Sequence, residues 1–154
     1  MKIDKKEKVI MKKKIMCLDV GDVRIGVALS DALHITAQGL QTYERIGIKK
    51  DTTNLLNLAI ENDVDTIVVG LNKKADGTES PQTQKVYDFK EKLENKIKST
   101  MPGEIELTYY DERYSTVIAE NILIQGDVSR AKRKTVIDKM AAMVILQGYL
   151  DSRK

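Results

Sequence analysis

The chain alternates between short apolar runs and longer segments in which apolar residues recur every three or four positions. Three segments near the start are apolar or alternate with polar residues, and they predict strands over residues 15–18, 24–30 and 35–43. A β-branched run at 66–71 and an alternating segment at 104–110 predict two more strands. The first three strands follow one another directly, which is typical of a meander.

Helical spacing of apolar residues predicts helices over residues 48–61, 82–97, 116–125 and 135–150. The order is three strands, then helices alternating with strands. This order predicts an α/β fold in which a mixed five-stranded sheet combines a three-strand antiparallel meander with two parallel strands, with helices packed on the sheet.

Length and composition agree with one globular domain, which we place at residues 15–151. The chain has 154 residues, of which 42% are hydrophobic, enough to bury one continuous core. No apolar run approaches the ~18 residues that a membrane helix needs, so we expect a cytoplasmic protein without a membrane partner. The single cysteine, Cys17, excludes an intrachain disulfide and a cysteine-rich zinc site.

The net charge of +3 is unevenly distributed. Residues 1–14 contain seven lysines and two acids, a charge of +5, which leaves −2 for the rest of the chain. We therefore expect residues 1–14 to be a basic, disordered tail. One dense basic run lies at 130–134, where a polyanion such as nucleic acid would find a suitable surface. Taken alone, this run is better explained as a solvated loop.

The first candidate for chemistry is Asp19, at the end of the first predicted strand. Gly21 follows it two residues later. A strand fixes the direction of a carboxylate, and a nearby glycine lets a phosphate approach the backbone. A purely structural turn explains the same two residues at least as well.

The second candidate is the group Asp111, Glu112 and Arg113, which directly follows the last predicted strand. The carboxyl ends of parallel strands meet at one edge of a sheet, so these residues can share a crevice with Asp19. Alternatively, the two acids mark the start of a following helix and interact favourably with its dipole, but this explanation gives the arginine no role.

The third candidate is Asp138, near the predicted start of the last helix. It shares a helix face with Ala141, Ala142 and Ile145, and the small side chains would let the helix lie close to the sheet. A carboxylate placed there is partly desolvated and needs a cation or a strong hydrogen-bond partner. A capping box formed with Thr135 is the alternative role.

Together, two strand ends and one helix can bring three carboxylate positions to one point. Hard divalent cations prefer such oxygen ligands. Phosphodiester hydrolysis uses bound cations to activate water and to stabilise the leaving oxygen. The pattern therefore predicts a metal-dependent reaction on a phosphate backbone.

Several segments resemble the YqgF family, in the family's order and spacing. The resemblance rests on residues 19–28, on 69–71 with Asp76 and Gly77, on 111–113 and on 137–142, and it covers roughly residues 14–150. It implies a ribonuclease-H-like fold related to Holliday-junction resolvases. It also implies a bacterial cytoplasmic protein of the kind described as a candidate pre-16S rRNA nuclease.

The resemblance also implies roles for single residues. Asp19, Glu112 and Asp138 would form the catalytic triad and hold Mg²⁺ or Mn²⁺, with Asp111 as a neighbouring or substitute ligand. Gly21 would admit phosphate, and Arg24 and Arg113 would contact phosphate or orient the carboxylates. The remaining contacts to the nucleic-acid backbone would come from Arg130, Lys132, Arg133 and Lys134.

The resulting hypothesis is a metal-dependent nuclease that processes the 5′ end of structured pre-16S rRNA in ribosome biogenesis, as a monomer or homodimer. A non-catalytic nucleic-acid-binding factor in ribosome maturation or transcription is one alternative, and a resolvase of branched DNA is another. An ATP-binding protein of the actin and sugar-kinase type also starts with an Asp-X-Gly turn. However, such proteins resemble two domains of this kind, and this chain has one.

Overall fold

A computed structural model of the chain describes residues 13–71, 78–111 and 130–153, with side chains from residue 138 onward in the last range. The five strands are β1 (Lys14–Val20), β2 (Arg24–Ser30), β3 (Ala37–Glu44), β4 (Val64–Leu71) and β5 (Glu106–Asp111). The helices of these ranges are α2 (Ile48–Glu61), α3 (Pro81–Thr100) and α5 (Arg130–Ser152).

The strands form one sheet in the order β3-β2-β1-β4-β5. Strands β1, β2 and β3 pair antiparallel, as a meander does, while β4 pairs parallel to β1 and β5 parallel to β4. The predicted mixed five-stranded sheet is therefore confirmed. Its parallel part brings the carboxyl ends of β1, β4 and β5 to the same edge.

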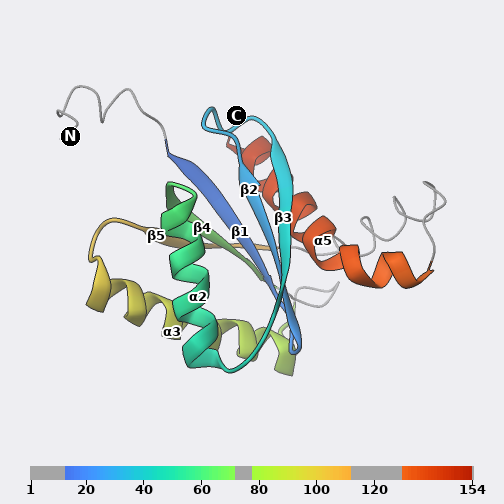
Figure 1. Ribbon diagram of the computed structural model, residues 1–154, viewed down its shortest axis with the longest axis horizontal. Helices are drawn as coiled ribbons and strands as arrows, with labels where there is room; N and C mark the ends of the chain where they lie inside the picture. The colour runs from blue at the N-terminus through green and yellow to red at the C-terminus, as the bar shows by residue number, and fades with distance from the viewer. Residues whose placement is uncertain (1–12, 72–77, 112–129, 154) are drawn as a thin grey trace.

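Helices cover both faces of the sheet (Figure 1). Helices α2 and α3 pack on one face, and α5 crosses the other face over β1, β2 and β3. The side chains of β1 alternate between these layers: Met16 and Leu18 lie in the core under α2 and α3, and Ile15 and Cys17 lie in the core under α5. The central strands β1, β2 and β4 are thus largely buried on both faces, whereas the edge strands β3 and β5 are more exposed.

Helix α3 begins where its sequence supplies a capping box. The Ser80 side chain accepts a hydrogen bond from the Thr83 amide, and the Thr83 hydroxyl accepts one from the Ser80 amide. Pro81 occupies the first helical position, where no amide hydrogen is needed. These contacts fix the start of the helix that runs beneath the β1–β2 turn.

Helix α5 begins at Arg130, five residues before the predicted start. The prediction was wrong because it followed apolar periodicity, which a basic run does not display, although arginine, alanine and lysine are all good helix formers. Residues 130–134 are therefore helical rather than a loop. Asp138 lies inside the helix, so a capping box formed with Thr135 is also wrong.

None of the described helices is both long and apolar enough to cross a membrane. The predicted helix at 116–125 and the turn residues Asp76 and Gly77 lie outside the described residues. The boundaries of the domain at residues 15 and 151 stay predictions.

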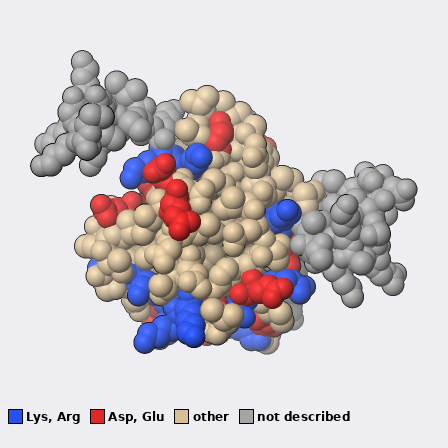
Figure 2. All heavy atoms as spheres, viewed as in Figure 1, with Lys and Arg blue, Asp and Glu red and all other residues tan. Residues whose placement is uncertain are grey.

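Figure 2 shows that basic side chains gather at the lower edge of the molecule in this view, where α2 begins and crosses α3.

Candidate active site

Asp19 lies one residue before the end of β1, on the face of the sheet that α5 covers. Alternation along the strand gives it the same orientation as Ile15 and Cys17, which pack under α5. Its side chain is half-buried, and its partner across the ladder is Gly26 of β2. The residue opposite Asp19 therefore has no side chain to separate the strand from the helix above.

The backbone of helix α5 occupies the place where a side chain of residue 26 would lie. A Cβ atom built on Gly26 would lie 1.9 Å from the carbonyl oxygen of Asp138. One turn further along, Ala141 and Ala142 are buried, and these small side chains let the helix approach the sheet as predicted. Asp138 thus stands over the residue that pairs with Asp19, and the fold brings these two acids together from positions far apart in the sequence.

Arg24 completes this group. It is the first residue of β2, and its Nε atom donates a hydrogen bond to Oδ2 of Asp138 over 2.8 Å. The hydrogen bond and the charge of Asp138 raise the pKa of Arg24 above its ordinary value. The Arg24 side chain is 42% exposed and that of Asp138 25% exposed. The partly desolvated carboxylate therefore has the cationic partner that the sequence predicted it would need.

The turn between β1 and β2 requires glycine at residue 21. The Gly21 amide donates to the carbonyl oxygen of Arg24 over 2.9 Å, and a Cβ atom on Gly21 would lie only 2.7 Å from that oxygen. On the other side of the turn, the ammonium group of Lys85 on α3 lies 3.0 Å from Asp22. The turn is closed from within and tied to α3.

A buried acid supports the turn from below, and the sequence analysis missed it. Asp51 is fully buried, and its carboxylate accepts hydrogen bonds over 2.9 Å from the Tyr43 hydroxyl, Arg45 Nε and the Ile46 amide. The same Arg45 donates through Nη1 to the carbonyl oxygen of Gly21 over 3.0 Å. The available signal was an acid on the apolar face of a helix, four residues before Leu55.

The hydrogen bonds of Asp51 should make the stability of the fold depend on pH. Burial alone would raise the pKa of the Asp51 carboxyl, but the hydrogen bonds from Ile46, Arg45 and Tyr43 outweigh it and hold that pKa below its ordinary value. A lowered folded pKa means that the stabilisation is fully present above the unfolded pKa of about 3.9 and is lost as pH falls through the folded pKa. We expect Asp51→Asn to lower the free energy of unfolding at neutral pH by about 3 kcal/mol.

Urea unfolding monitored by circular dichroism at neutral and at acidic pH checks this prediction. The difference between the wild type and Asp51→Asn should shrink as the pH falls below about 4. Glu61→Gln, which changes an exposed acid on the same helix, is the matched control and should unfold like the wild type at each pH. An equal effect of the two substitutions would contradict the role of Asp51.

Asp111, the last residue of β5, lies opposite Leu71 in the parallel ladder. Tyr109 packs against the core under α2 and α3, and Tyr110 packs against the core under α5. Alternation therefore places Asp111 on the face opposite to that of Asp19.

Glu112 and Arg113 lie outside the described residues. Arg130, Lys132, Arg133 and Lys134 lie in the first turns of α5, and their side chains are not among those described.

The described part of the chain contains no group of three or more histidine, cysteine, aspartate or glutamate side chains that could hold a metal ion. Asp19 and Asp138 are thus two acids near one point rather than a full set of three. Their oxygens suit a hard divalent cation, which often completes its coordination with water and substrate phosphate.

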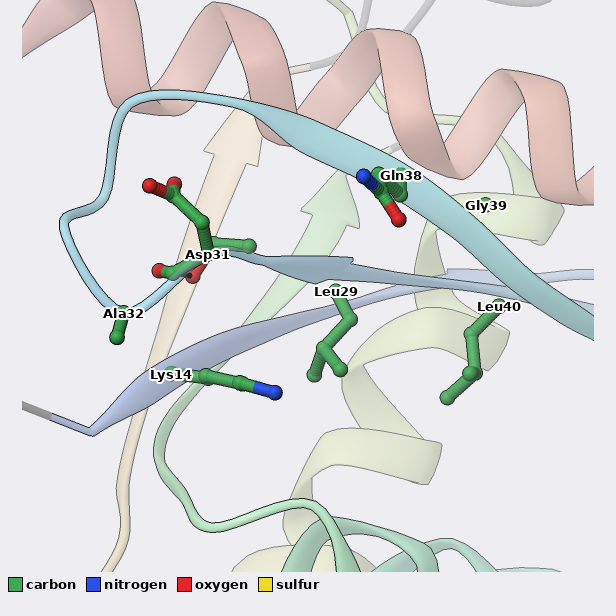
Figure 3. Close-up of a pocket in the computed structure, with 8 residues that line it drawn as sticks. Lys14, Leu29, Asp31, Ala32, Gln38, Gly39 and Leu40 are labelled. Carbon is green, nitrogen blue, oxygen red and sulfur yellow. Dashed lines mark hydrogen bonds between the residues drawn. The ribbon is translucent and has the colours of Figure 1, made fainter.

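A separate cavity of about 310 Å³ lies at the opposite end of the β1–β2–β3 meander. Figure 3 shows Lys14, Leu29 and Leu40 around this cavity, with the Asp31 carboxylate directed away from Lys14. That carboxylate accepts hydrogen bonds from the amides of Ile35 and Thr36 and so holds the β2–β3 loop. The acid of this cavity has a structural role, and the candidate active site remains at the Asp19 edge.

Comparison with known protein families gives one match that spans nearly the whole chain. A family model described as RuvX, Holliday junction resolvase, matches residues 13–152. The chain belongs to the RuvX family. The resemblance seen in the sequence motifs is therefore confirmed.

Several similar relatives carry the name of a candidate pre-16S rRNA nuclease. The relative from Desulforamulus reducens is 54% identical over 139 residues, which cover 90% of this chain and 97% of that protein. The relative from Clostridioides difficile is 49% identical over 138 residues, covering 90% of this chain and 94% of that protein. The match thus extends over almost the full length of these RuvX relatives.

Solved structures show the fold that RuvX shares with resolvases. RuvC of T. thermophilus, in complex with a Holliday junction substrate, superposes with a TM-score of 0.57 at 11% identity, covering 92% of this chain and 95% of that chain. The Fowlpox virus resolvase, in complex with Holliday junction DNA, gives a TM-score of 0.55 at 14% identity, covering 91% and 98%. The predicted ribonuclease-H-like fold is confirmed.

Proposed function

We propose that the chain is a divalent-metal-dependent nuclease that hydrolyses phosphodiester bonds of pre-16S rRNA. The observation that carries this proposal is the contact of α5 with Gly26, which places Asp138 beside the strand partner of Asp19. The names of the RuvX relatives support the choice of substrate. The family, described as Holliday junction resolvase, supports nuclease chemistry.

The two acids fit Mg²⁺ or Mn²⁺ by their chemistry and exposure. Mg²⁺ is typically held by one or two carboxylates and keeps the remaining positions for water and substrate phosphate. The partial exposure of Asp138 and Arg24 leaves a route for that phosphate. A bound ion would activate water and stabilise the charge on the leaving oxygen.

The residues around the acids have separate tasks in this proposal. Arg24 holds the Asp138 carboxylate in position and compensates its charge through the 2.8 Å hydrogen bond. Gly21 lets the β1–β2 turn close on the carbonyl oxygen of Arg24, and we assign the backbone of this turn to the approach of a phosphate beside Arg24. Residues 130–134, which are helical and basic, are assigned to the phosphate backbone, and Arg113 is assigned to phosphate or to orienting the acids.

We assign the third carboxylate to Glu112 rather than Asp111. Asp111 lies two residues after Tyr109 in β5, so its side chain is on the same face as that of Tyr109, away from Asp19 and Asp138. The carboxylate next in sequence is therefore the better candidate for the ligand that completes the set. These two neighbouring acids form a natural matched pair for an experiment.

Glu112→Gln is expected to lower Mg²⁺- or Mn²⁺-dependent cleavage of pre-16S rRNA by a factor of about 10³, because one ligand of the ion is removed. Asp111→Asn should retain activity within a factor of about three, less than 1 kcal/mol of barrier. Single-turnover cleavage of a labelled precursor fragment measures both, and EDTA should abolish cleavage by the wild type. Equal losses from both substitutions would contradict the assignment of Glu112 over Asp111.

A four-way DNA junction should be assayed in parallel, because the family model and the structural relatives are resolvases. Faster cleavage of the junction than of the RNA would favour the resolvase as the activity of this chain. Tight binding of either substrate without turnover under Mg²⁺ or Mn²⁺ would favour a non-catalytic nucleic-acid-binding factor.

A further inference from the structure

An open groove of about 440 Å³ lies between α2 and α3, on the side of the sheet away from α5. Lys49 and Thr52 line it from α2, and Lys92, Asn95 and Lys96 line it from α3. No acid is among the lining residues. This groove is part of the region in Figure 2 where basic side chains gather near the start of α2.

The lysines of the groove differ from the other lysines of α3 in their partners. Lys85 pairs with Asp22 over 3.0 Å, and Lys90 and Lys98 both pair with Glu94, over 3.3 and 3.0 Å. Within the described ranges, no ion pair with an acid is formed by Lys49, Lys92 or Lys96. The sequence of α3 thus compensates its other lysines and leaves those of the groove uncompensated.

The positive charges of the groove repel one another weakly in water, and a bound anion would remove this repulsion. Lys92 and Lys96 are one helical turn apart, and like charges at that spacing repel each other. Lys49 adds a third positive charge from the facing helix. The amide of Asn95 supplies a neutral hydrogen-bond donor at the same groove. Three cationic groups and a polar donor around a hollow suit oxyanions, and phosphate in particular.

The position of the groove relative to the candidate active site indicates which phosphates it binds. Helix α3 starts beneath the β1–β2 turn, where Lys85 is tied to Asp22. Lys92 follows Lys85 by seven residues, a rise of about 10 Å along the helix. A nucleic-acid strand that passes from the Asp19 side around the β1–β2 turn onto α3 would therefore reach the groove within a few nucleotides of Lys85.

We infer that the α2–α3 groove is a second binding site for the nucleic-acid backbone, contacting phosphates of the substrate strand beyond the point of cleavage. This inference rests on the proposed nuclease function for the identity of the substrate. The groove is distinct from the basic start of α5, a helix that packs on the other side of the sheet. The substrate is thus held on both layers around the acids.

The test measures binding of a fluorescently labelled single-stranded pre-16S rRNA fragment by anisotropy, with EDTA present so that no RNA is cleaved. The double variant Lys92→Gln/Lys96→Gln should bind about tenfold more weakly at low salt. The slope of log affinity against log salt should decrease in magnitude by about 1.4, or about 0.7 for each phosphate that the variant no longer neutralises. The matched control, Lys90→Gln/Lys98→Gln, removes the same charge from the same helix and should change the slope by less than half as much.

Cleavage kinetics then separate this site from the active site. With Mn²⁺ present, the groove variant should raise KM for the long fragment and leave kcat unchanged, because it removes binding away from the reacting phosphate. Equal salt slopes for the two double variants would overturn the groove and leave the nuclease proposal intact. If the wild type binds with the expected difference in slope but cleaves nothing, the groove stands and the proposed activity fails.

Discussion

Asp19→Asn is expected to lower the rate of metal-dependent cleavage of pre-16S rRNA by a factor of about 10³, equivalent to about 4 kcal/mol of transition-state stabilisation. Asparagine has nearly the same shape as aspartate but no charge, so β1 and its pairing with Gly26 should be preserved. The slower reaction would then come from weaker binding of the cation. Asp19 is carried by the central strand β1, which fixes the position of its backbone.

Two measurements make this prediction specific. Mn²⁺ should raise the melting temperature of the wild type by binding only the folded state, and this shift should be smaller for Asp19→Asn. Asp65→Asn changes an acid near the start of β4, at the other end of the sheet, and should cleave and melt like the wild type. Full cleavage by Asp19→Asn would show that the reaction occurs elsewhere.

Gly26→Ala is expected to have the largest effect on stability of any single methyl group added to the sheet. The added Cβ atom would lie 1.9 Å from the carbonyl oxygen of Asp138, so α5 must move away from β2. Overpacking of this kind typically costs about 3 kcal/mol of the free energy of unfolding. The same displacement would carry Asp138 away from Asp19, so cleavage should fall even under conditions in which the variant is fully folded.

Gly39→Ala is the matched control for this substitution. Gly39 lies in the neighbouring strand β3, and a Cβ atom there would come no closer than 3.3 Å, to the flexible side chain of Lys139. Urea unfolding should therefore show a change of less than about 1 kcal/mol for Gly39→Ala. Similar stabilities for the two alanine variants would mean that the contact of α5 with β2 is not as tight as the backbone positions indicate.

The strands and their order could be predicted because each side of this sheet is covered. Strands β1 and β4 are apolar on both faces, and such short uninterrupted runs are distinctive in a sequence. The start of α5 could not be predicted by the same method. Residues 130–134 contain no apolar pattern, and their helical structure follows from backbone preferences that periodicity does not measure.

The acids of the candidate site could be predicted from the sequence, but the residues that hold them and the β1–β2 turn in place could not. Asp19 was recognisable because it ends an apolar strand and a glycine follows two residues later, and Asp138 because an acid stands beside an apolar helix stripe. The reason for glycine at position 26 depends on a helix more than one hundred residues later in the chain. Asp51 resembled an ordinary acid in a first helical turn, and only the fold shows Arg45 linking it to Gly21. Contacts of this kind depend on tertiary structure and leave no local pattern.

The continuity of α5 from residue 130 to residue 152 fixes a rotational phase between the basic residues and the acid. Lys134 precedes Asp138 by four positions, which is about one turn and a rise of about 6 Å. Inserting one residue between them would rotate the whole basic segment by about 100° relative to the acid. If residues 130–134 bind the substrate and Asp138 holds the cation as proposed, the number of residues between them matters as much as their composition, because it sets the angle between the two sites.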